Sequence, residues 1–281
     1  MSDLEALLLG IVQGLTEFLP ISSSGHLIIV PWLQDYTFLE NHEAFNKTFD
    51  VALHAGTLVA AVAYFRREVA TFTVAFFRSA RRRAIETVDE RIAWAIAVGT
   101  IPAVIAGGLG SSFIEDHLGD PWMIGIQLIV FGALLGWADR LPEARDFDQV
   151  QIGDGLKVGL AQVLALAPGT SRSGITITAA RYLGFDRDTA ARVSFLLLIP
   201  AVGGATVYKA YEVANDGLPD GVAGPIIVGT IASAISGYIA IAWLLRLLRT
   251  HSYRPFVLYR YFAGAFILLL IATGIRSATF G

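Results

Sequence analysis

Long apolar stretches decide what this chain can fold into. Hydrophobic residues make up 54% of the 281 residues and charged residues only 16%, which is more apolar sequence than the core of a soluble domain needs. Leu- and Ala-rich runs without alternating ten-residue segments favour helices over a membrane β-barrel. Candidate spans near the ~20 residues of a bilayer crossing lie at 51–66, 92–110, 121–139, 193–209, 222–246 and 256–275. The sequence therefore predicts an all-α integral membrane protein with six transmembrane helices.

Two further apolar segments, at 4–33 and 156–184, are interrupted near their centres. Pro20 and Pro168 cannot continue a helix, and the serine clusters that follow them favour caps and turns. Each segment is therefore predicted to be a re-entrant hairpin of two half-helices that enters and leaves by the same face.

The two interrupted segments are also related to each other in sequence. Their matched residues differ in number by 149 (159 − 10, for example), and the pairs are Gly10 and Gly159, Gln13 and Gln162, Leu15 and Leu164, Ser22 and Ser171, Ser24 and Ser173, and Gly25 and Gly174. Further along, Val98–Ile101 recurs unchanged as Val228–Ile231. The order of these matches predicts one membrane domain, 1–281, made of two homologous repeats at about 1–145 and 150–281.

The distribution of charge predicts opposite orientations for the two repeats. Arginines gather at 66–91 and 246–260, which the positive-inside rule places in the cytoplasm. Acidic residues dominate the connections that are predicted to lie outside with both termini, namely 35–50, 111–121 and 210–221. With six crossings, the first hairpin must enter from outside and the second from the cytoplasm, so the repeats are inverted. The segment 67–91 is alternatively a surface amphipathic helix with an Arg-rich face.

Polar groups of the second interrupted segment indicate an anion site. Arg172 lies between two serines, and a guanidinium there can donate two parallel hydrogen bonds to a phosphate. The alternative is a structural arginine that pairs with Glu17. Hydroxyls of Ser171, Ser173 and Thr176 would add donors, and Gly174 would allow the backbone to approach an anion closely.

The first interrupted segment adds acid–base groups. Gln13 and Glu17 are four residues apart and share one helix face. The run Ser22–His26 brings three hydroxyls, Gly25 and an imidazole together, and a serine near a histidine can be a nucleophile activated by a base. His54, Asp50 and Thr57 are plausible residues of the site's mouth, although an interfacial His or Asp is more often simply hydrated.

The stretches Gln13–His26 and Pro168–Thr176 closely resemble the undecaprenyl-diphosphate phosphatase family, also called the bacitracin-resistance family, and the resemblance covers almost the whole chain. It implies a phosphohydrolase that removes the terminal phosphate of a C55 polyprenyl diphosphate and recycles the lipid carrier of cell-wall precursors. The implied location is the plasma membrane, multi-pass, with the active site open to the outer face. The expected partners are the polyprenyl diphosphate and membrane lipids but no nucleic acid, and a homodimer is left open.

The resemblance also assigns roles residue by residue. The implied catalytic residues are Glu17, Ser23, His26 and Arg172, and the implied substrate-binding residues are Gln13, Ser22, Ser24, Gly25, Ser171, Ser173, Gly174 and Thr176. A divalent cation, Mg²⁺ or Ca²⁺, is implied as a bridge between Glu17 and the diphosphate. Gln13 stands where some members of the family have Glu, so Glu17 must carry any carboxylate role.

Two questions stay open at the level of sequence. Either Ser23 attacks phosphorus to give a phosphoseryl intermediate, or His26 and Glu17 activate a water molecule. The alternative function is a transporter or flippase, because inverted repeats with broken helices are also a transporter architecture. The spacing of Ser23 and His26 favours hydrolysis. The N-terminus has no basic region or cleavage site, so no removable signal peptide is expected.

Overall fold

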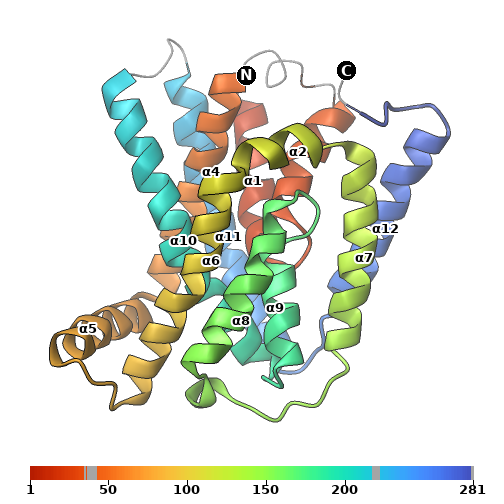
Figure 1. Cartoon of the computed structure of the whole chain (residues 1–281). Helices are drawn as coiled ribbons and strands as arrows, with labels where there is room; N and C mark the ends of the chain where they lie inside the picture. The colour runs from red at the N-terminus through yellow and green to blue at the C-terminus, as the bar shows by residue number, and fades with distance from the viewer. Residues whose placement is uncertain (35, 37–42, 217–221, 280–281) are drawn as a thin grey trace.

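The computed structural model describes residues 1–34, 36, 43–216 and 222–279, and apart from one isolated bridge between Arg145 and Phe185 its regular elements in these ranges are helical. Their bounds are α1 Asp3–Phe18, α2 Ser23–Gln34, α4 Glu43–Tyr64, α5 Arg66–Arg82, α6 Val88–His117, α7 Pro121–Ala138, η1 Phe147–Gln149, α8 Ile152–Gln162, η2 Val163–Leu166, α9 Arg172–Tyr182, α10 Arg187–Asp216, α11 Ala223–Leu248 and α12 Arg254–Ala272. The all-α prediction is confirmed (Figure 1).

Within the described ranges, five helices are long and apolar enough to cross a membrane: α6, α7, α10, α11 and α12. The pair α4 and α5 meets the same criterion only when the two are taken together, which gives up to six candidate spans. This agrees with the six predicted crossings. In Figure 1 both termini lie at one end of the bundle, here called the upper end, and α5 lies across the lower end.

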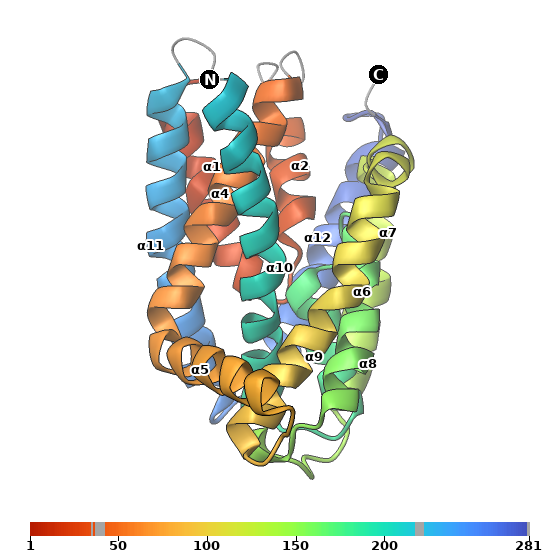
Figure 2. The ribbon, with the colours of Figure 1, turned by 60° about the vertical axis from the view of Figure 1, so that its left-hand side comes forward.

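An 85° bend at Phe65 separates α4 from α5. Phe65 is fully buried beside Phe195, so the bend is anchored in the core. Apolar residues of α5 recur at helical spacing, and Phe76 lies 4.7 Å from the ring of Trp94 on α6. The alternative interpretation of segment 67–91, a surface amphipathic helix with an Arg-rich face, is thus the correct one for residues 66–82 (Figure 2).

Helix ends differ from the prediction, because several helices continue past their apolar stretch. Asp50, predicted in an outer loop, lies inside α4, and the backbones of 111–117 and 210–216 are helical. Arg260 was predicted to belong to a cytoplasmic arginine cluster; it is instead a fully buried residue of α12. The predicted outer residues Asp35, Glu40 and Asp220 lie outside the described residues.

Both interrupted segments form helical hairpins, as predicted. The helices α1 and α2 pack on each other, as do α8 and α9. In Figure 1 the first hairpin enters from the upper end and the second from the lower end. Their tips touch inside the bundle, where Ser22 Oγ accepts from Gly169 N at 3.1 Å and Ser173 Oγ donates to the Leu19 carbonyl at 3.0 Å.

Glycines allow α1 and α11, and likewise α8 and α6, to touch backbone to backbone. A Cβ on Gly10 of α1 would lie 2.4 Å from the Gly229 carbonyl oxygen of α11, and a Cβ on Gly159 of α8 would lie 2.0 Å from the Gly99 oxygen of α6. In lipid there is no hydrophobic driving force between helices, so close van der Waals packing of small residues at such crossings stabilises the helix pair instead. The hairpins are therefore fixed to α11 and α6 by close packing.

These contacts follow the pattern that the sequence repeat predicts. Gly10 corresponds to Gly159 in the repeat, and Gly229 corresponds to Gly99. Replacing each glycine by its counterpart turns the contact of α1 with α11 into the contact of α8 with α6. The division into two inverted repeats stays a prediction, and the exchange of contacts supports it.

The glycine crossings predict that two alanine substitutions within α8 differ in their effect on the melting temperature. Gly159→Ala should lower the melting temperature, because overpacking against a backbone costs roughly 1 to 3 kcal/mol. Gly153 has open space around it, so Gly153→Ala should leave the melting temperature unchanged or raise it. Thermal unfolding in detergent measures both, and equal melting temperatures for the two variants would contradict the crossing.

Candidate active site

The tips of the two hairpins share an unusual backbone conformation. Ser22 and Ser171 both have a positive φ, 77° and 75°, a conformation that is rare for residues other than glycine. Each serine immediately precedes a helix, and its hydroxyl accepts a backbone N–H of the first turn, from Gly25 at 3.3 Å and from Gly174 at 3.0 Å. These caps position the first residues of α2 and α9, which include Ser23 and Arg172.

A buried ion pair joins the hairpins. Arg172 donates to Glu17 Oε1 from Nη2 at 2.9 Å and from Nε at 3.2 Å, and its Nη1 donates to the Ser194 carbonyl at 3.2 Å. The carboxylate is 3% exposed and the guanidinium 14%, so water screens the pair little. Glu17 is thus the partner that the structural interpretation of Arg172 assigned to it. The phosphate role of Arg172 stays a prediction.

The second oxygen of Glu17 gathers the neighbouring polar side chains. Glu17 Oε2 accepts from Ser23 Oγ at 2.6 Å and from Gln13 Nε2 at 3.0 Å. The short bond to Ser23 directs the hydroxyl proton at a carboxylate that can receive it. The packing of Phe18 against Phe195, with ring centroids 5.3 Å apart, holds the end of α1 that carries Glu17.

His54, which the sequence suggested as a residue of the site's mouth, completes the surroundings of Glu17. Its Nε2 lies 3.6 Å from Glu17 Oε2, and its Nδ1 faces the Asp50 carbonyl at 2.8 Å. A carbonyl only accepts, so Nδ1 carries a proton; a neutral ring would then point a lone pair at the carboxylate. His54 thus joins the polar side chains that surround Glu17.

His26 lies in a separate part of the site. Its Nδ1 donates to the Ser22 carbonyl at 2.6 Å, and its Nε2 is 2.6 Å from the Tyr259 hydroxyl of α12. The two rings are stacked, with centroids 5.6 Å apart. In the neutral ring the proton is on Nδ1 and the free electron pair is on Nε2. Ser23 donates to Glu17 and not to His26, whose basic nitrogen faces Tyr259.

The remaining predicted site residues are placed as follows. Ser171 Oγ and Ser173 Oγ are 3.3 Å apart, and Thr176 Oγ1 lies 2.7 Å from both the Arg172 carbonyl and Ser194 Oγ. These three side chains are buried. The hydroxyl of Ser24 is half-buried and makes no hydrogen bond within the described chain, so it is available to a ligand.

Arg260 supports both hairpin tips from α12. Its guanidinium donates to the carbonyls of Pro20, Gly169 and Thr170 at 3.0 to 3.2 Å, and also to those of Leu128 and Gln127. Pro20 and Gly169 come from opposite hairpins, so one buried side chain fixes their relative position. The predicted span 256–275 already contained Arg260, but its hydrogen-bond partners could not be deduced from the sequence.

The site offers two oxygen ligands to a divalent cation, from Glu17 and Gln13. Within the described residues no group of three or more His, Asp or Glu side chains could hold a metal. Glu17 is the carboxylate of the cluster, and Gln13 Oε1 beside it is buried without a hydrogen-bond partner. One carboxylate and one amide oxygen fit a cation that brings its other oxygen ligands from a phosphate and water.

Fold and site together define a multi-pass membrane protein with a buried Glu–Arg–Ser cluster and an adjacent histidine, arranged for chemistry on an anion. The profile of the family described as "Bacitracin resistance protein BacA" matches residues 6–266. The chain belongs to this family.

Curated relatives cover nearly the whole chain. A Geobacter sulfurreducens protein is 47% identical over 270 residues, which is 95% of this chain and 98% of the relative. A Pelobacter propionicus protein is 44% identical over 277 residues, 98% of this chain and 99% of the relative, and a Nocardioides protein is 44% identical over 280 residues, 98% of each. All three are named undecaprenyl-diphosphatase. These names favour the hydrolase over the transporter alternative.

The buried ion pair predicts that a variant without both charges can be thermally stable and still inactive. Arg172→Ala should abolish phosphate release and destabilise the protein by roughly 3 to 5 kcal/mol, because it leaves a buried carboxylate unpaired. The double variant Arg172→Ala/Glu17→Gln removes both charges and should recover most of the melting temperature while staying inactive. Melting temperatures in detergent, with phosphate release measured on the same samples, provide the test. A double variant as unstable as the single one would show that the pair does not govern stability.

Proposed function

We propose that this protein is an undecaprenyl-diphosphatase, which hydrolyses the terminal phosphate of a polyprenyl diphosphate and returns the lipid monophosphate to cell-wall synthesis. The same activity would give resistance to bacitracin, the property for which the matching family is named. The observation that carries the proposal is the 2.6 Å hydrogen bond from Ser23 to buried Glu17, itself paired with Arg172. The names of the full-length relatives supply the substrate class.

In the proposed first step, Ser23 Oγ forms a bond to the terminal phosphorus while the bond from that phosphorus to the bridging oxygen breaks. The hydroxyl proton passes to Glu17, and the polyprenyl monophosphate leaves. Protonation removes the charge of Glu17 and weakens its hold on Arg172. The guanidinium is then free to donate to the oxygens of the transferring phosphoryl group, where negative charge accumulates.

In the second step a water molecule attacks the phosphoserine. The Tyr259 hydroxyl, which faces Nε2 of His26, accepts a proton from this water and passes its own proton to Nε2. Glu17 returns its proton to Ser23 Oγ as phosphate leaves, and His26 then releases its proton to solvent. Tyr259 holds the imidazole by stacking and by its hydroxyl. Ser24, whose hydroxyl has no protein partner, is a donor to the bound diphosphate.

The proposal includes a divalent cation that binds together with the substrate. Glu17 and Gln13 Oε1 would hold it, and it would neutralise part of the diphosphate charge. Because Gln13 is neutral, the site itself attracts a cation less strongly than a pair of carboxylates would, and the diphosphate must contribute more of the binding.

The proposed location is the plasma membrane, with the site open to the outer face. The hairpin that carries Glu17, Ser23 and His26 enters from the end opposite the exposed arginines of α5 (Figure 1). Arginines mark the cytoplasmic end by the positive-inside rule, so this hairpin opens outward.

The nucleophile can be tested with Ser23→Ala. If Ser23 attacks phosphorus, this variant should retain almost no phosphate release, because the attacking atom is gone. If Ser23 only donates a hydrogen bond, the loss should be on the order of 10 to 1000-fold. The matched control is Ser24→Ala, for which we expect about a 10-fold loss from one hydrogen bond.

Rapid quench with substrate labelled in its terminal phosphate gives the independent readout. The parent, or a His26→Ala variant that stalls before hydrolysis, should carry labelled protein. A Ser23→Ala enzyme that works at a tenth of the parental rate would exclude Ser23 as nucleophile and leave water, activated by His26 and Glu17.

The orientation can be tested by labelling single cysteines in this chain, which has none of its own. The predicted outer position Asn41 lies outside the described residues, so Thr279→Cys at the upper end and Arg67→Cys on α5 are the better pair; both side chains are exposed. In intact cells an impermeant maleimide should label Thr279→Cys alone, and after lysis both. Labelling of Arg67→Cys in intact cells would reverse the proposed orientation.

A further inference from the structure

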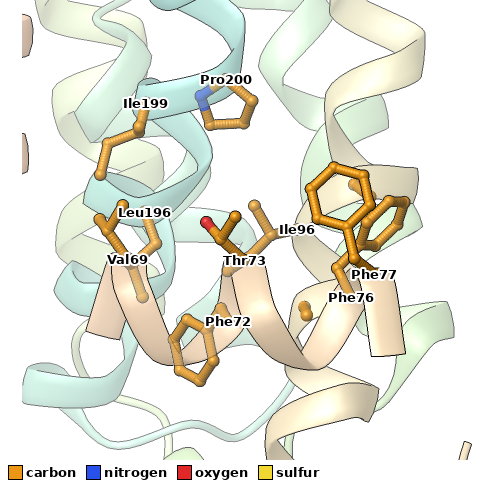
Figure 3. Close-up of a pocket in the computed structure, with 11 residues that line it drawn as sticks. Val69, Phe72, Thr73, Phe76, Phe77, Ile96, Leu196, Ile199 and Pro200 are labelled. Carbon is orange, nitrogen blue, oxygen red and sulfur yellow. The ribbon is translucent and has the colours of Figure 1, made fainter. Parts of the chain in front are cut away.

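An apolar groove lies along α5, on the side that faces α6 and α10 (Figure 3). Its volume is about 260 Å³, and its walls come from α5, α6 and α10. Thr73 contributes a polar group from α5, and the other lining side chains are apolar. Ala93 and Ala97 on α6 leave the space open, because a larger side chain at either position would fill it.

The position of the groove excludes a water-soluble ligand. Its walls α6 and α10 are candidate membrane spans, and α5 turns away from α4 by 85° at the end of the bundle. Phe77 of α5 lines the groove and is still 66% exposed. An exposed phenylalanine beside a groove between spans faces lipid chains, so an alkyl chain is the ligand that fits this environment.

Arginines of α5 favour anionic ligands beside the groove. Arg78 and Arg82 on α5 pair with Glu90. A second set of exposed arginines makes no ion pair within the described chain: Arg66, Arg67, Arg81 and Arg83. Unpaired arginines at the surface of an amphipathic helix attract anionic headgroups by about 1 kcal/mol each.

Helical spacing places two of these arginines next to the groove. Val69, Thr73 and Phe77 line it along one face of α5. Arg66 precedes Val69 by three residues, and Arg81 follows Phe77 by four, so each arginine neighbours one lining side chain on the helix surface. Arg67 projects from a different face, and Arg83 lies beyond the last helical residue.

We propose that this groove is a binding site for an anionic phospholipid. One acyl chain occupies the groove between α5, α6 and α10, and the phosphate group is held by Arg66 or Arg81. The same lipid contacts Leu196 and Ile199 of α10. The proposal does not depend on the chemistry assigned to the active site.

The test compares lipid binding by variants of the full chain in detergent, measured by native mass spectrometry with phosphatidylglycerol and, separately, phosphatidylcholine. Ala97→Phe fills the groove, and Val104→Phe adds the same side chain at an exposed position further along α6. Arg66→Gln/Arg81→Gln removes the two flanking charges, and Arg67→Gln/Arg83→Gln removes two exposed charges, one on α5 and one just after it, that neighbour no lining side chain.

We expect the parent and both control variants to retain phosphatidylglycerol, and Ala97→Phe and Arg66→Gln/Arg81→Gln to bind it at least ~10-fold more weakly, as loss of a charge-assisted contact predicts. Phosphatidylcholine should bind the parent more weakly than phosphatidylglycerol does. Phosphate release by Ala97→Phe should stay close to that of the parent, which shows that the variant is folded.

Three results would overturn the proposal. Equal weakening by the two double arginine variants would mean that only diffuse charge matters. Equal binding of both phospholipids would mean an unselective lipid surface. Displacement of phosphatidylglycerol by a polyprenyl monophosphate, or a dimer that Ala97→Phe dissociates, would assign the groove to the substrate's tail or to a second copy of the chain.

Discussion

The ion pair of Glu17 and Arg172 is the interaction on which the site depends. Each charge comes from a different hairpin, and neither could remain in an apolar bundle alone, because an unpaired buried charge is strongly destabilising. The pair therefore requires that both hairpins reach the same depth. It also keeps the two groups that the proposed chemistry needs, a base and a phosphate ligand, within 3 Å of each other before substrate arrives.

The sequence was sufficient for the hairpins and for most of the Glu17 cluster. Pro20 and Pro168 break helices for a local reason, the loss of a backbone donor, so their effect can be read without tertiary information. Ser22 and Ser171 cap the next helices for a similarly local reason. Glu17 and Arg172 were predicted as a pair or as separate functional groups because intramembrane charges are costly wherever they lie.

Residues whose role depends on distant contacts could not be predicted in the same way. His54 is three turns into α4, and only the packing of α4 beside α1 brings it to Glu17. Arg260 was counted as a loop arginine because composition does not show that five carbonyls converge on one point of α12. Helix ends were misplaced for a related reason: α6 and α10 have 30 residues each, so they extend beyond the apolar window that defines a span.

The glycine crossings have a mechanical consequence. Where Gly10 meets Gly229 and Gly159 meets Gly99, main chains touch without an intervening side chain, so the helices of each pair cannot slide past each other without a collision. Each pair consequently behaves as a rigid body, α1 with α11 and α8 with α6. Any breathing of the molecule that admits a bulky lipid headgroup must then occur at the seam between these bodies. Ser22 and Arg260 lie at that seam, where Ser22 accepts from Gly169 and Arg260 donates to the carbonyls of Pro20 and Gly169.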